Sequence, residues 1–162
     1  MPSTFFWTGH AAENNKNIVA MVRDADSNMH EIGCHSLVHE TLGDPIFPLP
    51  NNWPVFPFEV EGRIREATRL VKEASGVDPV SFRCPRLWGS TKVVNVLEDL
   101  NYKADASLPL YFYRTMYKPY HPSREDWTRE GDMRLVEIPN FCDLAMESND
   151  PYNRDRDQWP LF

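Results

Sequence analysis

The stretch NMHEIGCHSLVH, residues 28–39, decides the fold of this chain. Its residues 29–34 (MHEIGC) predict a short β-strand, and the segment that follows leaves the end of this strand. His35 and His39 stand four residues apart directly after it. The flanking sequence indicates what kind of sheet this strand belongs to.

Strands and helices alternate on both sides of this stretch. The expected strands are 4–8, 29–34, 80–83, 102–108 and 133–138, and the expected helices are 11–25, 60–74 and 91–100. Alternation in units of this length indicates βαβ crossovers and a mostly parallel sheet, open or closed into a barrel. Functional residues in such folds lie at the carboxyl ends of the strands, which is where His35 and His39 stand.

The longest interruption of this pattern is 42–58, where five prolines exclude any regular element of more than a few residues. We expect an ordered loop there, rich in aromatic side chains. Trp53 and Phe56 of this loop, together with Trp88 and Tyr111, have two interpretations. They line a groove and stack on sugar faces, or they fill the core beneath proline-rich loops. The sequence leaves both open.

Length and charge limit the classes of protein. The 162 residues are enough for one domain, 1–162, with a core in 2–140 and a frayed tail at 150–162. The net charge of −7, from 17 basic and 24 acidic residues, argues against a nucleic-acid partner. No apolar run approaches the roughly 20 residues of a membrane helix. The start resembles no secretory signal, so a cytoplasmic location is expected for the chain as given.

The cysteines form an odd set without C-x-x-C spacing. This argues against a disulfide framework or a thiolate zinc site, and it predicts reduced thiols. The three residues are Cys34, Cys84 and Cys142.

The histidine pair has a chemical interpretation of its own. If the residues between His35 and His39 turn helically, both imidazoles project from one face and can share a cation such as zinc. Spacing alone is weak support, because histidines four apart are more often a solvated or packed pair. The position at a strand end favours a metal site, and the Ser36 hydroxyl can hold the turn.

Four segments, in order and spacing, resemble the NodB-like polysaccharide deacetylases. Residues 30–39 resemble the family segment H-E-(I/L)-G-x-H-(S/T)-x-x-H. The others are Thr4-Phe5-Phe6, similar to A-T-F-F; residues 82–89 (FRCPRLWG), similar to F-R-x-P-x-G; and residues 102–108 (YKADASL), similar to G-Y-x-x-D-x-S. The resemblance covers about 2–108, with a looser echo in 136–139, and implies a deformed (β/α) barrel.

This resemblance also implies a chemistry. His35 and His39 would bind the catalytic divalent metal, zinc in most of the family. Arg83 would orient a catalytic aspartate, and Asp105 would lie beside the groove. The reaction would be hydrolysis of an acetyl group from an N-acetylated sugar. A divalent ion polarises the amide carbonyl and activates water, while a carboxylate takes the proton.

The chain departs from the family at its start and its end. The family's T-F-D-D strand, which supplies the base and the third metal ligand, would precede 4–8, and the chain begins at Met1. Met1-Pro2 resembles the interior G-(M/I)-P of the family, so a truncated domain is expected, incomplete at the N-terminus and at the C-terminus. Two histidines alone should bind a metal weakly. The uncovered sheet edge predicts self-association.

The function that these observations favour is a metal-dependent deacetylase-type hydrolase acting on a carbohydrate, with reduced or no activity in this truncated form. Two alternatives stay open. The first is hydrolysis of another non-peptide C–N bond in a small amide, as in allantoinase-like relatives. The second is a carbohydrate-binding remnant that keeps the aromatic groove without the chemistry.

Overall fold

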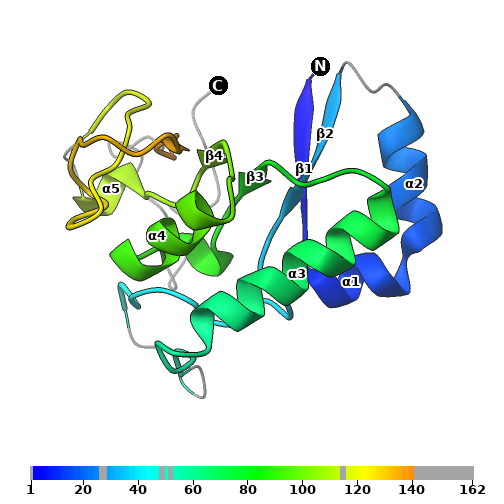
Figure 1. Cartoon of the computed structure of the whole chain (residues 1–162), viewed down its shortest axis with the longest axis horizontal. Helices are drawn as coiled ribbons and strands as arrows, with labels where there is room; N and C mark the ends of the chain where they lie inside the picture. Colours follow the sequence, from blue (N-terminus) through cyan, green and yellow to red (C-terminus); the bar gives the residue numbers. More distant parts are fainter. Residues whose placement is uncertain (1, 26–28, 48–49, 51–52, 114–115, 141–162) are drawn as a thin grey trace, which may run out of the picture.

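A parallel sheet with helices packed against it forms the body of the molecule (Figure 1). The computed structural model describes residues 2–25, 29–47, 50, 53–113 and 116–140. Within them the sheet has five strands in the order β1-β2-β3-β4-β5, and every neighbouring pair is parallel. The strands are β1 Ser3–Trp7, β2 His30–Cys34, β3 Ser81–Phe82, β4 Ala104–Asp105 and β5 Val136–Glu137. The expected α/β class with a parallel sheet is confirmed, and the described strands do not close into a barrel.

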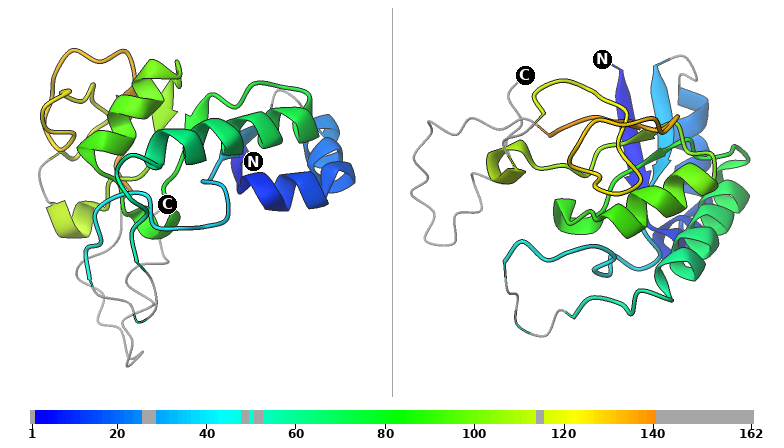
Figure 2. Two further views of the ribbon diagram at one scale, coloured as in Figure 1. Left: turned by 60° about the horizontal axis from the view of Figure 1, so that its bottom comes forward. Right: turned by 60° about the vertical axis from the view of Figure 1, so that its left-hand side comes forward.

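Helices α1 to α4 pack against one another in one layer, and α5 lies apart from α1, α2 and α3 (Figures 1 and 2). They are α1 Gly9–Asn14, α2 Lys16–Ala25, α3 Val60–Ser75, α4 Thr91–Asp99 and α5 Leu110–Tyr113, with a 3₁₀ turn, η1, at Pro85–Leu87. α3 contacts α1, α2 and α4, while α2 and α3 also lie against β2. The apolar side chains between this layer and the sheet make the core.

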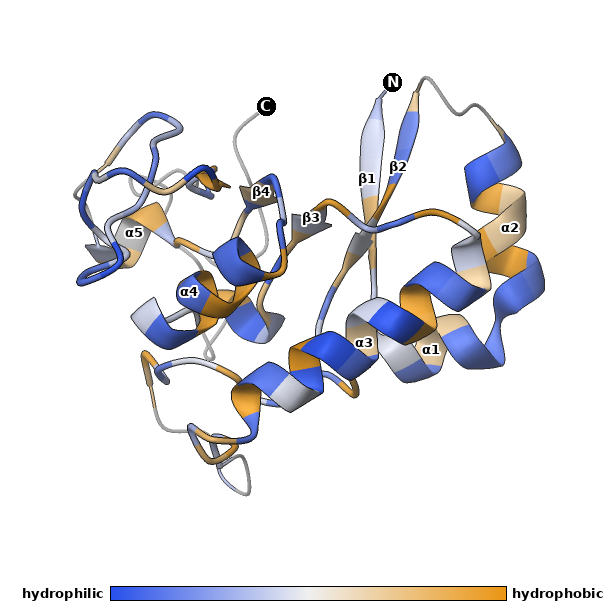
Figure 3. Cartoon of the chain, in the orientation of Figure 1, coloured by the Kyte–Doolittle hydropathy of each residue, from blue (hydrophilic) through white to orange (hydrophobic). Residues whose placement is uncertain are grey.

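Helix α3 shows how the sequence pattern produces this packing. Its residues Ile64, Ala67 and Val71 are fully buried, while charged side chains cover the outer face (Figure 3). Apolar residues three and four positions apart lie on one side of a helix, which therefore buries that side. Gly76 ends the helix in the left-handed conformation, with φ of 75°, which glycine adopts without a steric penalty.

The expected helix 11–25 is instead two helices, because the chain breaks at Asn15. This residue has φ of −132° and ψ of 40°, and its side chain donates to the carbonyl of Ala11 at 2.8 Å. Asparagine side chains compete in this way for backbone hydrogen bonds. The expected helix is therefore interrupted at the Asn14–Asn15 pair.

The later strands are shorter than expected. Ladder pairing is limited to two residues in each of β3, β4 and β5, where the sequence predicted four to seven. Isolated bridges add to this pairing: Pro109 pairs with Asn140 in parallel, and Tyr120 pairs with Glu137 of β5 in an antiparallel bridge. A short helix, α5, lies between the expected strands 102–108 and 133–138, where no helix was expected.

The described parts of the 42–58 loop extend away from the helices and the sheet (Figure 2). A parallel bridge between Thr41 and Pro54 ties its two arms at the base. At Gly43 a Cβ atom would overlap the carbonyl of Trp88 and the backbone of Gly89. The loop base thus fits closely against the residues that follow β3.

Strand β1 is at one edge of the described sheet. Thr4 and Phe5 of this strand are exposed, Phe5 at 39%. Self-association through this edge stays a prediction. Among the described residues no helix is long and apolar enough to cross a membrane.

Candidate functional site

The two histidines lie on a tight turn at the carboxyl end of β2. The His35 amide donates to the carbonyl of Trp7 at 2.8 Å, which continues the β1–β2 pairing. Ser36 and His39 then adopt positive φ values of 69° and 66°. These left-handed positions reverse the chain and bring the second histidine back toward the first.

Glu40 stabilises this turn from within. Its carboxylate accepts hydrogen bonds from the Ser36 hydroxyl at 3.0 Å, the Leu37 amide at 3.3 Å and the Val38 amide at 2.7 Å. The buried Ser36 hydroxyl in turn accepts from the His39 amide at 3.1 Å. The expected role of Ser36 in holding the turn agrees with these contacts, and Glu40 is a residue that the sequence did not single out.

The imidazole rings of His35 and His39 have centroids 5.0 Å apart and an interplanar angle of 63°. Two imidazoles bound to one tetrahedral ion at about 2.0–2.1 Å place their ring centres roughly 5 Å apart. Nδ1 of His35 lies 2.7 Å from the carbonyl oxygen of Arg83 and therefore donates to it, which leaves Nε2 as the basic nitrogen. The spacing of the two rings and the tautomer of His35 are compatible with a shared cation.

Burial keeps this pair in the neutral form that binds metals. Desolvation lowers the pKa of His35 to about 4. It also lowers the pKa of the more exposed His39, and the charge of Arg86 acts in the same direction. Neutral imidazole is the ligating form, so both rings are ready to bind a cation at neutral pH.

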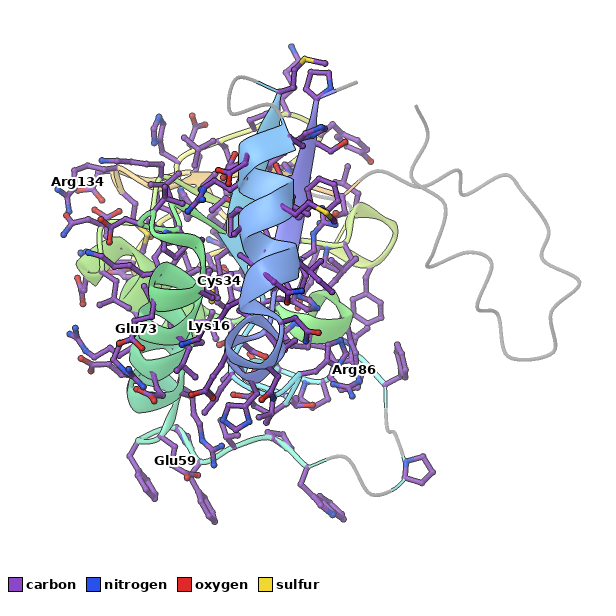
Figure 4. All side chains as sticks on the ribbon, turned by 90° about the vertical axis from the view of Figure 1, so that its right-hand side faces the viewer. Lys16, Cys34, Glu59, Glu73, Arg86 and Arg134 are labelled. Carbon is purple, nitrogen blue, oxygen red and sulfur yellow. The ribbon has the colours of Figure 1, made fainter. Side chains whose placement is uncertain are left out.

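Arg86 lies beside the histidines on a strained turn. Arg86 and Leu87 both have φ of 59°, an arrangement that costs energy for residues with a Cβ. The Arg86 guanidinium donates to the His39 carbonyl at 3.2 Å and lies over the Trp88 ring, 5.6 Å from its centroid. Figure 4 shows its side chain at the end of the body that faces the 42–58 loop.

Arg83 is joined to the site through its main chain. Its amide donates to the Cys34 carbonyl at 3.1 Å, and its own carbonyl accepts from His35. The guanidinium turns toward the next strands: it donates to the Ala106 carbonyl at 3.1 Å and to the Asn140 side chain at 2.9 Å. Phe6 lies under it, with 4.8 Å between Cζ and the ring centroid.

Asp105 is fully buried at the end of β4, in register with Glu137 of β5. Its Oδ1 accepts from the Ser107 hydroxyl at 2.6 Å. Burial raises the pKa of Asp105 to about 6 and that of Glu137 well above its usual range, the latter also because of the neighbouring Asp105. Arg83 and Asp105 line a cavity of about 340 Å³. The sequence did not single out Glu137.

The four aromatic candidates separate into different environments. Trp53 and Phe56 are exposed on the loop, at 84% and 65%, and the Phe56 ring stacks on Phe58. Trp88 is only 1% exposed, so it belongs to the core, and its ring has no open face on which a sugar could stack. Tyr111 lies in α5, and its side chain is outside the described residues.

The described residues contain no group of three or more His, Cys, Asp or Glu side chains able to hold one ion. Cys34 and Cys84 are free and buried, burial raises the pKa of both thiols, and they pack as small apolar residues of the core. Cys142 lies outside the described residues.

The family profile described as Polysaccharide deacetylase matches residues 1–104, well over half of the chain. The chain therefore belongs to the polysaccharide deacetylase family, as the four segments predicted. No curated protein shows a significant match.

Solved structures share this fold. A Mycobacterium smegmatis protein described as a polysaccharide deacetylase superposes with a TM-score of 0.64 at 22% identity, covering 93% of this chain and 47% of its own. PuuE allantoinase gives a TM-score of 0.60 at 17% identity, covering 88% and 40%. A CE4 family pseudoenzyme from Bacillus anthracis gives 0.54 at 21%, covering 65% and 33%. The chain thus spans half or less of the length of these structures, and identities this low establish the fold alone.

Proposed function

We propose that this chain carries the metal-binding part of a hydrolase that removes N-acetyl groups from a carbohydrate. The observation that supports this best is the neutral His35–His39 pair at the end of β2, with His35 oriented by the Arg83 carbonyl. Family membership supports the same reaction class. A bound zinc or similar divalent ion would polarise the amide carbonyl and lower the pKa of a water molecule.

The chain's own residues would supply ligation, orientation and a surface. Nε2 of His35 and a ring nitrogen of His39 would be ligands, while Glu40 keeps the turn that brings the two rings together. Exposed Trp53 and Phe56 would offer aromatic faces to sugar rings. Arg83 would hold the loop after β4 in place by donating to the Ala106 carbonyl. Arg86 would add positive charge next to them.

A second candidate is a carbohydrate-binding role without catalysis. It is favoured by the donor count, since catalytic zinc sites use three protein ligands and the described residues bring two together. The exposed aromatic side chains of the loop would serve this role equally well. Hydrolysis of a different C–N bond stays open as a third reaction class, because the fold is shared with PuuE allantoinase.

One set of measurements separates these candidates. Co²⁺ titration, followed by its visible absorption, should show one weak site in the wild type that is lost in His35→Ala and in His39→Ala. Acetate release from an N-acetylated chitooligosaccharide should require the same two residues. Binding of that oligosaccharide without Co²⁺ binding or acetate release would support the non-catalytic role, and Co²⁺ binding that survives both substitutions would contradict the proposed site.

A further inference from the structure

Glu137 and Asp105 form a buried pair of carboxyl groups that the metal ligands do not explain. Both side chains are fully buried, at 0% exposure. Asp105 and Glu137 are in register on neighbouring strands, Ser107 donates to both carboxyls, and Oδ2 of Asp105 and Oε2 of Glu137 have no donor among the described groups. Two ionised carboxylates buried side by side repel each other, so one of the two is expected to hold a proton.

The surroundings indicate which residue carries that proton. Oε1 of Glu137 accepts two main-chain amides, from Ser107 at 3.1 Å and Leu108 at 2.8 Å. The charge of the Arg83 guanidinium acts on both carboxyls and more strongly on Asp105, whose ionised form it favours. A protonated Glu137 that donates to an ionised Asp105 leaves one buried negative charge beside one positive charge. Cys84 and Tyr120 also face the pair, and burial keeps both of these groups neutral.

The pair is linked to the histidines by short steps. The Glu137 carboxyl holds the main chain at 107–108 by accepting its two amides. The Ser107 hydroxyl donates to Asp105 and accepts a hydrogen bond from the Cys84 amide at 2.8 Å. Cys84 follows Arg83 directly, and Arg83 is bound again to this segment through the Ala106 carbonyl. The Arg83 carbonyl then accepts the Nδ1–H of His35.

We propose that Glu137 is a positioning residue: as a carboxylic acid it donates to Asp105, and this pair holds Arg83 so that its carbonyl fixes the tautomer of His35. The inference rests on the proposed role of His35 and His39 as cation ligands. Carbonyl or carboxylate partners of a ligating histidine orient the ring and set its tautomer, and losing them typically costs 10–100-fold in metal affinity. Glu137 would act on His35 indirectly, through Asp105 and Arg83.

Glu137→Gln and Glu137→Ala test this in the full chain. The glutamine keeps both the acceptor oxygen and a donor toward Asp105, so it should retain the Nδ1–H tautomer of His35 and Co²⁺ affinity within about twofold of wild type. The alanine should give a mixture of His35 tautomers and about 10-fold weaker Co²⁺ binding. The tautomer is read by ¹H–¹⁵N NMR of the imidazole without metal.

Glu98→Ala is the matched control for stability. Glu98 is also buried, and its carboxylate accepts the main-chain amides of Arg134 and Leu135, so its loss should destabilise the fold comparably. It should leave the His35 tautomer unchanged. If Glu137→Ala does not fold, Glu137→Asp, which shortens the reach to Asp105, takes its place.

Three results would overturn the inference. They are a wild-type tautomer in Glu137→Ala, an equal loss of tautomer in Glu98→Ala, and a Glu137 carboxyl that ¹³C NMR shows ionised together with Asp105 at pH 7. A failure of the proposed function is distinct from these. Wild-type protein that binds no Co²⁺ would remove the metal site, whereas the tautomer measured without metal would still report whether Glu137 positions His35.

Discussion

Replacing Glu40 by alanine should loosen the turn that carries the two histidines. The carboxylate of Glu40 accepts three hydrogen bonds within the turn, from Ser36, Leu37 and Val38. A hydrogen bond to a charged group contributes about 1.5–3 kcal/mol. The Leu37 bond is long and the Val38 amide is exposed, so we count these two at the low end or below it. The expected loss of unfolding free energy is about 2–3 kcal/mol.

The same substitution should weaken cation binding. Ser36 and His39 occupy left-handed conformations, which cost about 1 kcal/mol or more each. Without the Glu40 carboxylate the turn can relax to ordinary φ values, and the His39 ring then moves away from His35. Loss of a group that orients ligands lowers metal affinity about 10–100-fold. Urea denaturation and Co²⁺ titration of the same samples measure both effects.

Glu61→Ala is the control for this experiment. Glu61 is exposed on α3 and pairs with Arg65 four residues later, an interaction that contributes about 0.3–0.5 kcal/mol. Its removal should leave Co²⁺ affinity unchanged. The reasoning is refuted if Glu40→Ala unfolds within about 0.5 kcal/mol of wild type and binds Co²⁺ equally well, since the carboxylate would then not stabilise the turn.

Three further outcomes test the fold and the buried carboxyls. Gly43→Ala should lower the melting temperature strongly because the new Cβ atom would overlap the Trp88 carbonyl. Gly62→Ala, at an exposed position of α3, should instead raise stability by about 0.5–1 kcal/mol. Similar melting temperatures for the two variants would contradict this reasoning. Asn101→Gly, at φ of 63°, should stabilise by a few tenths to about 1 kcal/mol in urea denaturation, and a loss would count against a strained Asn101. Burial raises the pKa of Asp105 from 3.8 to about 6, so the folded state holds this proton more tightly than the unfolded state. This contribution is present below about pH 4 and is lost as the pH rises through 6, and Asp105→Asn should reduce that slope in the pH profile of stability.

Local patterns were sufficient to predict the elements with strong periodicity. Helix α3 was expected at 60–74, and it spans Val60–Ser75. The helix expected at 91–100 is α4, whose N-cap Ser90 accepts the Val93 amide at 3.3 Å. Both helices depend on residues three and four positions apart, which the sequence displays directly. The ends of β3, β4 and β5 depend on where neighbouring segments diverge, and no local pattern records that.

The same distinction between local and distant residues applies to the candidate site. His35, His39 and Ser36 lie within one short segment, so their spacing and the strand before them were enough to predict that they meet. Glu137 lies far along the chain from His35, and only the parallel order β2-β3-β4-β5 brings it to the same edge of the sheet. A glutamate at the end of a short strand is, in sequence, indistinguishable from a solvated one. Only the structure distinguishes it, because there Glu137 and Asp105 are buried in register on neighbouring strands. Burying two ionised carboxylates together costs stability unless the two groups share a proton.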